Sequence, residues 1–368
     1  MSLQLTNYWW LLIWLFLGGA ICSYFPKRRE VLGDQIVTRW DIWPAIILVL
    51  PYIIWAGYRG DWADTGLYRA GFLNRTEPMS AIPSIFAGDG KDPGFTVLMI
   101  LLKGFIGNSD KLFFMIVAAF HMLCIGEIYR KFSTNYWFCV FLFVASTDYM
   151  SWMHNGIRQF IAVTAIFACF DWLLKKRFIP LVGVILLVST IHGSALLMIP
   201  IIFIVQGEAW NIKTILTLIL TMVVVIFIDR FTPVLNNLLQ DTQYDNMMTN
   251  GIWENDDGTS MIRVLVYSVP ALLSLLGLKH IRRANDPIIN ISVNCAIVTM
   301  AIYLVSAVSS GIYIGRIPIY TTLQGYMALP WLIDHIFDKK SAQLMYVLTV
   351  VMFVLFFFFQ MHFVWGLV

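Results

Sequence analysis

The sequence is short of charged residues. Asp, Glu, Lys and Arg make up 13% of its 368 residues, about half the share usual in soluble domains. Hydrophobic residues make up 59%, and the mean hydropathy is +0.74. So few polar side chains cannot cover a water-facing surface, which excludes a soluble fold. The apolar residues form continuous runs without period-two alternation, so we predict an all-α, polytopic integral membrane protein and no barrel.

Other absences exclude further classes. The net charge is only +3 and there is no basic tail, so nucleic acid is not an expected partner. The five cysteines are an odd number and lie inside apolar runs, which predicts neither a disulfide framework nor a metal site. The basic loops hold no Gly-rich phosphate loop, which argues against ATP or a nucleotide sugar. No cationic segment or cleavage site flags a signal peptide, so we expect a first span from Tyr8.

The apolar runs predict about twelve membrane spans in a single transmembrane domain over residues 1–368, because about 20 apolar residues cross a bilayer. Several runs are shorter than that. A further run, 95–106, is interrupted by Lys103, which predicts a re-entrant or interfacial segment. The twelve runs lie at 8–25, 40–56, 111–129, 137–150, 157–174, 178–191, 194–206, 212–228, 263–279, 288–308, 317–334 and 342–364.

Short loops rich in Lys and Arg predict the orientation, since such loops stay in the cytoplasm. All of them can be cytoplasmic only if 95–106 does not cross, and both termini then face outside. The outer face carries two long polar loops, 57–95 and 229–262. The alternative is that 178–206 is a single span and not two, which would invert the orientation of every later span. The basic clusters are Lys27 to Arg29, Arg130-Lys131, Lys175 to Arg177, Lys279 with Arg282-Arg283, and Lys339-Lys340.

A first polar cluster follows the second span and comprises Arg59, Asp61, Trp62, Asp64, Tyr68 and Arg69. If a helix starts near Asp61, then Asp64 and Tyr68 share a face, and a carboxylate beside a hydroxyl and arginines could act as a general base. Trp62 and Tyr68 could stack on a sugar ring. The alternative is a salt-bridged loop anchored by interfacial aromatic residues.

A second cluster opens the span 157–174 and comprises His154, Asn155, Arg158 and Gln159. The spacing predicts that they line one face of the first helical turn. Arg158 there opposes the helix dipole unless an anion lies beside it, and a phosphate would suit both the guanidinium and the free N–H groups. The alternative is an ion pair between Arg158 and Asp148.

Two smaller motifs also lie on the predicted outer face. Arg316 and Pro318 open the span 317–334, so a second cation lies at a positive helix end, and two such sites suggest a diphosphate. His192 lies in a turn between two spans, where it could accept a hydroxyl proton or simply be a hydrogen-bonded turn residue. No residue pair has zinc-site spacing. The spans hold almost no ionisable group at mid-depth, which argues against an ion-coupled transporter.

The runs Tyr58 to Tyr68, Asn155 to Ala162 and Ile191 to Ala195, followed by Arg316 and Tyr320, resemble the EpsG family of multi-spanning bacterial polysaccharide proteins. The Asn-x-x-Arg-Gln-x-x-Ala element is the most specific of these. The family is similar in role to Wzy-type polymerases, which implies the bacterial cytoplasmic membrane and chemistry on its outer face. It also implies a fold resembling membrane glycosyltransferases of the GT-C type. The segment Arg75 to Gly94 departs from the family pattern.

Together these observations predict a glycosyltransferase that joins undecaprenyl-diphosphate-linked repeat units of a surface polysaccharide, with neither metal nor cofactor. Arg158, Arg316 and Arg59 would hold the diphosphate. The predicted partners are the lipid-linked oligosaccharide and membrane lipids, with a flippase and a chain-length regulator as further candidates. The candidate bases are Asp61, Asp64, His154 and His192, with Asp64 and His192 preferred. The predicted substrate contacts are Arg59, Trp62, Tyr68, Arg69, Asn155, Arg158, Gln159, Arg316 and Tyr320.

Two alternatives stay open. The first is a ligase or acyltransferase on the same face, although an enzyme that used cytoplasmic acyl-CoA should show an inner polar cluster, and none is present. The second is a flippase for lipid-linked oligosaccharide. A flippase should line its spans with cations that are reachable from both faces, whereas the cations here are divided between inner loops and outer helix ends.

Overall fold

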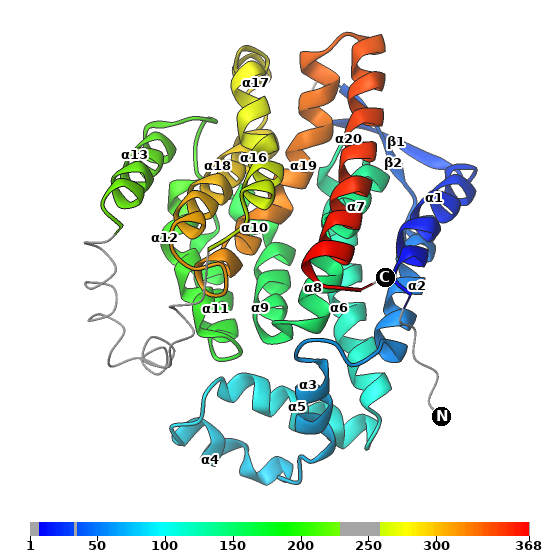
Figure 1. Cartoon of the computed structure of the whole chain (residues 1–368), viewed down its shortest axis with the longest axis vertical. Helices are drawn as coiled ribbons and strands as arrows, with labels where there is room; N and C mark the ends of the chain where they lie inside the picture. The colour runs from blue at the N-terminus through cyan, green and yellow to red at the C-terminus, as the bar shows by residue number, and fades with distance from the viewer. Residues whose placement is uncertain (1–6, 33–34, 229–257, 368) are drawn as a thin grey trace. The chain divides into compact units, whose positions relative to one another are not determined.

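The computed structural model describes residues 7–32, 35–228 and 258–367. Contacts within the chain divide it into two compact units, Met1–Leu197 with Phe337–Val368 (unit 1) and Met198–Ile336 (unit 2). Each is described by itself, and the single transmembrane domain stays a prediction. Most described residues are helical, as the apolar runs predict (Figure 1).

Unit 1 contains helices, two short 3-10 turns, a π-helical turn and one β-hairpin. The helices are α1 (Trp9–Ser23), α2 (Ile42–Tyr58), α3 (Thr65–Leu73), α4 (Ile82–Ala87), α5 (Pro93–Ile106), α6 (Asp110–Phe132), α7 (Tyr136–Ala145), α8 (Asp148–His154), α9 (Ile157–Ala168), α10 (Phe170–Leu174), α11 (Phe178–Ser189) and α20 (Lys339–Phe359). The 3-10 turns are η1 (Met79–Ala81) and η2 (Gly193–Leu197), and the π-helical turn is η4 (Gln360–Val364).

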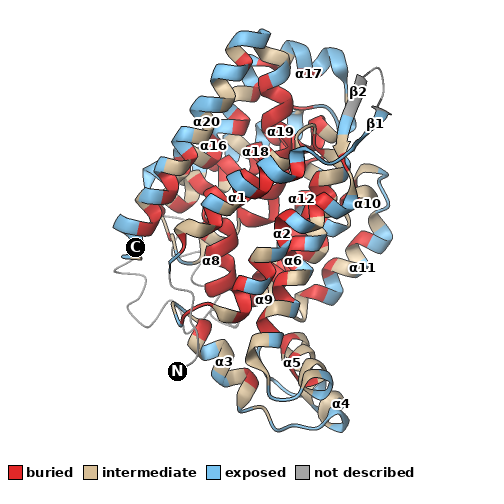
Figure 2. Ribbon diagram, turned by 90° about the vertical axis from the view of Figure 1, so that its right-hand side faces the viewer, coloured by how far each residue is buried: buried red, intermediate tan, exposed pale blue. Residues whose placement is uncertain are grey.

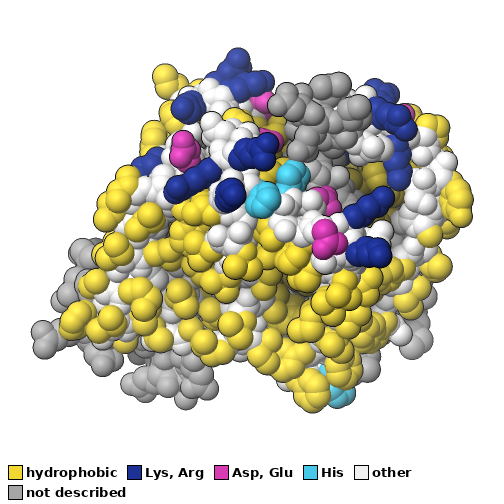
Figure 3. All heavy atoms as spheres, turned by 90° about the horizontal axis from the view of Figure 1, so that it is seen from above, with side chains coloured by type: hydrophobic (Ala, Val, Ile, Leu, Met, Phe, Trp, Pro, Cys, Tyr) yellow, Lys and Arg dark blue, Asp and Glu magenta, His cyan; other side chains and the backbone are white. Residues whose placement is uncertain are grey.

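Helices α1, α2 and α6 alternate in direction. The Tyr52 hydroxyl donates to the Leu11 carbonyl over 2.6 Å, which holds α1 against α2. Between α2 and α6, Lys111 Nζ lies 4.7 Å from the Tyr58 ring centroid, so the start of α6 lies beside the end of α2. Unit 1 therefore has a polar end, where α2 ends and α6 begins, and a basic end, where α2 begins and α6 ends. The face seen from above carries many Lys and Arg side chains (Figure 3).

Helix α5 does not run the length of unit 1. Because α2 and α6 are antiparallel, the chain between them leaves and returns at the polar end. Helix α5 has 14 residues, about 21 Å at 1.5 Å per residue, which is short of a bilayer core of about 30 Å. It lies at the polar end, where α6 begins (Figure 1), and Lys103 Nζ donates to the carbonyls of Phe72, Leu73 and Arg75. That 95–106 does not cross the membrane stays a prediction.

Several predicted spans are divided. The run 137–150 breaks between α7 and α8, where Thr147 has φ +69°, and the run 157–174 breaks at Cys169 between α9 and α10. Among the described helices, α6, α18 and α20 with its π-helical turn are long and apolar enough to cross a membrane, and the bent pair α16–α17 could be a fourth span. Many of the other apolar helices have 10–17 residues, so the count of twelve stays a prediction.

The basic segment after α1 is a β-hairpin, which the prediction of a short loop missed. Strand β1 (Lys27–Leu32) pairs antiparallel with β2 (Gln35–Trp40), with Lys27 opposite Trp40. Glu30 and Arg39 form an ion pair of 3.0 Å across the hairpin. This ion pair is diagonal, because the register places Arg28 opposite Arg39 and Glu30 opposite Val37. The fold is thus helical with one small β-hairpin at the basic end.

Unit 2 is built around two buried helices. Its elements are α12 (Met198–Ile204), α13 (Ile212–Ile226), α16 (Met261–Leu276), α17 (Leu278–Ala284), α18 (Pro287–Ala307), η3 (Ile314–Arg316) and α19 (Ile319–Ile336). Every residue of α19 from Ile319 to Ile333 is buried (Figure 2). Asn290 and Asn294 of α18 accept from the backbone N–H groups of Ala209 and Trp210, both over 3.1 Å. These amides stabilise the turn before α13 where no helix supplies a partner.

Candidate functional site

The Arg59 pocket lies at the polar end of unit 1, just after α2. The Arg59 side chain is buried, with 1% of the residue exposed. Its Nη1 donates to the Ala56 carbonyl over 2.7 Å and its Nη2 to the Met153 carbonyl over 2.8 Å. The guanidinium carbon lies 3.8 Å from the centroid of the Phe114 ring. Burial lowers the pKa of Arg59 to about 9, so the group is still charged at neutral pH and is held on all sides by protein.

His154 belongs to the same pocket. Its Nδ1 shares a hydrogen bond of 2.7 Å with the Thr65 hydroxyl, and Arg59 Nε lies 3.5 Å from the same hydroxyl. The ring of Trp62 packs edge-on, with centroids 5.1 Å apart. Burial first and the Arg59 charge second hold the pKa of His154 well below its ordinary value, while the Trp62 backbone opposes them. His154 is therefore a neutral, enclosed imidazole.

The predicted common face of His154, Asn155 and Arg158 is wrong. Helix α8 ends at His154, Asn155 is extended with φ −133°, and Gly156 has φ +99°. This left-handed position favours glycine, and a Cβ there would also lie 2.9 Å from the Trp152 ring. Helix α9 begins only at Ile157. The turn thus sends His154 toward α3 and leaves Arg158 on the first turn of another helix.

The acidic residues of the first cluster are not equivalent. Helix α3 begins at Thr65 with Asp64 directly before it, so the helix starts later than the position near Asp61 that the shared face of Asp64 and Tyr68 assumed. Asp61 pairs with Arg69, whose Nε also lies 2.6 Å from an Asp110 carboxylate oxygen. Asp64 is half-buried, and within the described part of the chain its carboxylate has no hydrogen-bond partner. Arg69 is thus neutralised by two carboxylates, while Asp64 is free to act.

Arg158 forms an ion pair with a carboxylate that the sequence did not single out. Its Nη1 lies 2.5 Å from Asp92 Oδ2, and the two side chains are 32% and 4% exposed. The predicted alternative, a pair with Asp148, is therefore wrong. Among the residues that the structure describes, Arg158 has no other hydrogen-bond partner. Its remaining N–H donors are available, because a guanidinium carries five.

The His192 turn meets the same carboxylate. His192 Nδ1 and the Ser194 hydroxyl share a hydrogen bond of 2.7 Å, and the Gly193 backbone N–H donates to the Asp92 carboxylate. The Gly94 N–H donates to the Thr190 carbonyl over 2.8 Å, and a Cβ on Gly94 would lie 2.2 Å from the Thr190 hydroxyl. Burial raises the pKa of Asp92 against the opposing effect of Arg158. We call Asp92, Arg158 and the turn 190–194 the Arg158 site.

The other predicted contacts divide between the two units. Gln159 is buried at 3% exposure next to Arg158, whereas Asn155 is half-buried in the α8–α9 turn. Trp62 packs against Trp365, with ring centroids 4.8 Å apart. Tyr68 packs against the ring of Phe95, at the start of α5. The polar end of unit 1 therefore gathers the first and second clusters and the His192 turn.

Arg316 and Tyr320 lie in unit 2. Arg316 is half-buried at the end of η3, and α19 starts three residues later at Ile319. Arg316 therefore precedes the first turn of α19, where the backbone N–H groups of Thr321 and Thr322 both donate to the Pro318 carbonyl, each over 2.9 Å. Tyr320 is buried at 2% exposure. The predicted outer loop 229–262 lies outside the described residues up to 257.

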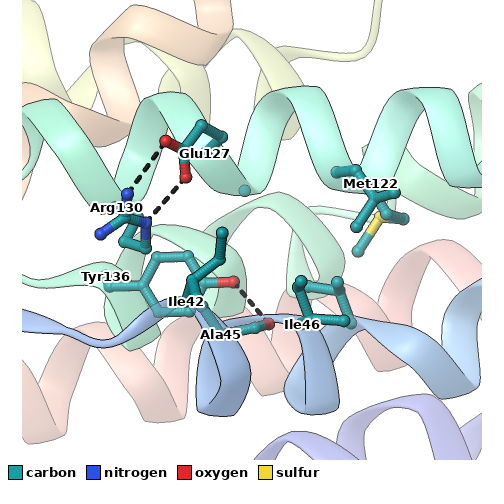
Figure 4. Close-up of a pocket in the computed structure, with 10 residues that line it drawn as sticks. Ile42, Ala45, Ile46, Met122, Glu127, Arg130 and Tyr136 are labelled. Carbon is teal, nitrogen blue, oxygen red and sulfur yellow. Dashed lines mark hydrogen bonds and ion pairs between the residues drawn. The ribbon is translucent and has the colours of Figure 1, made fainter.

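An apolar pocket of about 240 Å³ opens between α2 and α6 toward the basic end (Figure 4). Its charged residues are paired with each other: Arg130 Nε and Nη2 both donate to the Glu127 carboxylate, over 2.7 and 2.9 Å. The Tyr136 hydroxyl donates to the Ala45 carbonyl. No group of three His, Cys, Asp or Glu side chains that could hold a metal occurs in the described ranges.

Comparison with known proteins places the chain in a family. The model of the EpsG family matches residues 42–365, nearly the whole chain. The protein belongs to the EpsG family. That membership makes it a polysaccharide biosynthesis protein, and its long apolar helices are those of a multi-pass membrane protein. No curated protein and no solved structure matches the chain.

The EpsG-family sequence motifs account for part of the site. The resemblance singled out Arg59, Arg158 and His192, and the structure places all three at the polar end of unit 1. It did not include Asp92, and it gave no role to Thr65, which lies inside the run Tyr58 to Tyr68; these two residues connect the motifs through an ion pair and a hydrogen bond. A signal for Asp92 was present in Asp92-Pro93-Gly94, because an acidic residue before a proline often starts a helix.

Proposed function

We propose that this protein is a polysaccharide polymerase that joins undecaprenyl-diphosphate-linked oligosaccharide repeat units on the outer face of the bacterial cytoplasmic membrane. EpsG family membership supports the substrate class. The observation that carries the proposal is the Arg158 site, where a half-exposed arginine with spare donors lies beside a buried carboxylate and a histidine turn. A transferase that expels a diphosphate needs an anion-binding cation next to a proton acceptor.

The proposed reaction is a displacement at the anomeric carbon of the growing chain. A hydroxyl of the incoming unit attacks that carbon, and the bond to the diphosphate oxygen breaks with its electron pair. Arg158 holds the leaving diphosphate and stabilises its charge. The chemistry requires a base but no metal, because the diphosphate is already an activated leaving group.

The structure changes which residues we favour for these tasks. Arg59 and His154 are enclosed by protein, so we assign them to positioning the turn between α8 and α9. Asp61 is bound to Arg69, whereas Asp64 forms no ion pair in the described part of the chain and His192 bonds Ser194 in the turn next to Asp92, so Asp64 and His192 remain candidate bases. Trp62 and Tyr68, both half-buried, are the candidates for stacking on sugar rings.

The distribution of charge in unit 1 supports an outward-facing site. Lys27, Arg130, Lys131 and Lys175 lie toward the basic end, and Lys and Arg mark the cytoplasmic side of membrane proteins. The Arg158 site lies at the opposite end of α6 and α9. A substrate that is assembled on its lipid and exposed on the outer leaflet would therefore meet it directly.

The test uses purified protein in nanodiscs with its own lipid-linked repeat unit and no nucleotide, and resolves the products by size. We expect a ladder of multiples from the wild type and none from Arg158→Ala. The matched control is Lys175→Ala, which removes a cation whose partner, Asp171, lies 2.7 Å away at the basic end. If the repeat unit stays single but becomes accessible on the other leaflet of sealed vesicles that contain the protein, the protein is a flippase and the proposal is wrong.

A further inference from the structure

The pairing of Arg158 raises a question about the resting state of the site. Arg158 is proposed to hold a diphosphate, but in this structure it is already paired with a carboxylate, since Asp92 Oδ2 lies 2.5 Å from Arg158 Nη1. Carboxylate and phosphate bind a guanidinium through the same N–H···O geometry, so they compete for it. The pair uses one nitrogen of Arg158, and no other partner occurs in the described part of the chain. A diphosphate can therefore approach the free donors before it displaces the carboxylate.

Asp92 is held in place by its backbone as well as by Arg158. It has φ +53°, a left-handed conformation that aspartate adopts more readily than most residues. It directly precedes α5, whose second residue, Gly94, is bonded to Thr190, and the Gly193 N–H donates to its carboxylate. These contacts do not involve Arg158. The carboxylate therefore stays in the site when Arg158 turns to another anion.

The segment 59–92 is tied to the α8–α9 turn at both ends. At its start, Arg59 Nη2 donates to the Met153 carbonyl over 2.8 Å, and Thr65 shares a hydrogen bond with His154. At its end, Asp92 pairs with Arg158. The first tie is buried, whereas the second has a half-exposed cation. Only the second tie can exchange its partner for a ligand from solvent.

On these contacts, and resting on the polymerase function proposed above, we propose that Asp92 is the general base of the transfer and that Arg158 holds it in reserve until the diphosphate takes its place. The acceptor hydroxyl gives its proton to the Asp92 carboxylate as its oxygen bonds to the anomeric carbon. The electron pair of the broken bond leaves on the polyprenyl diphosphate, which Arg158 holds. Asp92 thus replaces Asp64 and His192 as the first candidate for the base.

The environment of Asp92 supports this exchange. Burial raises its pKa, and Arg158 together with Lys91 and the Gly193 N–H opposes that rise. When a diphosphate neutralises Arg158, the largest opposing charge is lost and the carboxylate binds a proton more strongly. A base that strengthens as the leaving group binds couples the two halves of the reaction. Among the described residues, the charged groups that act on it are Arg158 and Lys91, and His192 directly precedes Gly193, whose N–H bonds the carboxylate.

The first test measures binding of farnesyl diphosphate, a short prenyl diphosphate, to the full-length protein in nanodiscs. Asp92→Asn keeps the shape, the tolerance of a left-handed backbone and an acceptor for Gly193, but it removes the competing charge. We expect it to bind the probe about tenfold more tightly than the wild type. In an Arg158→Ala background the same substitution should leave the affinity unchanged. Equal or weaker binding by Asp92→Asn alone would overturn the proposal that a diphosphate displaces the Asp92 carboxylate from Arg158.

The second test measures ladder formation from the lipid-linked repeat unit by the same proteins. We expect Asp92→Asn to lose about 10²- to 10⁴-fold in turnover, as the loss of a general base predicts. Asp171→Asn is the matched control, because it removes a carboxylate paired with Lys175 at the basic end, and its turnover and binding should equal those of the wild type. Unchanged turnover in Asp92→Asn would overturn the base role and leave the polymerase intact. A wild type without a ladder would overturn the polymerase and the base role together, whereas the binding result would still decide the exchange.

Discussion

Arg59 and Arg158 are the same residue type at the same end of unit 1, yet the structure uses them differently. Arg59 is 1% exposed and donates to two main-chain carbonyls. Arg158 has a side chain that is 32% exposed and bonds a single carboxylate. The comparison teaches that an arginine in a family motif can either stabilise the fold or be free to bind a ligand. The two roles differ in how far the side chain is buried and in how many of its N–H donors already have partners.

The physical reason lies in the cost of an unpaired buried group. A buried carbonyl that loses its donor costs about 1–3 kcal/mol, so a guanidinium that serves two of them cannot leave for a substrate. The Arg158 pair has a half-exposed cation, and its carboxylate keeps the Gly193 N–H as a donor, so Arg158 can exchange Asp92 for another anion more easily than Arg59 can leave its carbonyls. The Arg59 pocket is therefore expected to govern stability, and the Arg158 site to govern turnover.

The largest effect is expected when Arg158 is removed. We expect Arg158→Ala to lower the rate of chain extension about 10²- to 10³-fold, because a donor aimed at developing charge contributes about 2.7–4 kcal/mol to a transition state. The melting temperature in detergent should move little. Arg158→Lys, which keeps the charge but not the fork, should recover part of the rate. A variant that melts much earlier would place Arg158 among the structural residues.

Arg59 should behave in the opposite way. We expect Arg59→Met to lower the free energy of unfolding by about 2–3 kcal/mol, since it leaves the carbonyls of Ala56 and Met153 without their donor. The measurement is the denaturation midpoint of the purified protein by tryptophan fluorescence. At temperatures where the variant is folded, its affinity for farnesyl diphosphate should match the wild type. A loss of affinity without a loss of stability would make Arg59 a ligand-binding residue.

Thr65→Val should have a smaller effect on the same pocket. The substitution keeps the volume and removes the hydroxyl that bonds His154 over 2.7 Å, so we expect a loss of about 1 kcal/mol in stability. Thr65→Ser, which keeps the hydroxyl, should lose less. A double-mutant cycle with His154→Phe should give a coupling energy of similar size. No coupling would mean that the bond does not stabilise the α8–α9 turn.

The smallest effect is expected at Trp62. Its ring packs against Trp365 and His154, and an aromatic contact contributes about 0.5–1.5 kcal/mol. Trp62→Leu should raise the KM for the lipid-linked unit less than about tenfold and leave kcat unchanged. Trp43→Leu, on an exposed ring at the start of α2, is the matched control. A change in kcat would assign Trp62 to the chemistry instead of to sugar binding.

The sequence predicted the helical membrane class because apolar runs are a local signal, and all twelve runs coincide with helices over most of their length. It predicted Arg158 and His192 as site residues from their place at helix ends. It could not predict Asp92 as their partner, since 66 positions separate Asp92 from Arg158 and only packing brings them together. It also placed His154 on the wrong helix, because a left-handed Gly156 ends α8 without any break in the apolar pattern.

The role of Arg158 is tested most directly by a structure of the protein in nanodiscs with a bound prenyl diphosphate. The account predicts that a phosphate oxygen lies within hydrogen-bonding distance of Arg158 and that the bond from Arg158 Nη1 to Asp92 is broken, while the Arg59 contacts to Ala56 and Met153 are unchanged. A diphosphate bound elsewhere, with the pair of Arg158 and Asp92 intact, would contradict it.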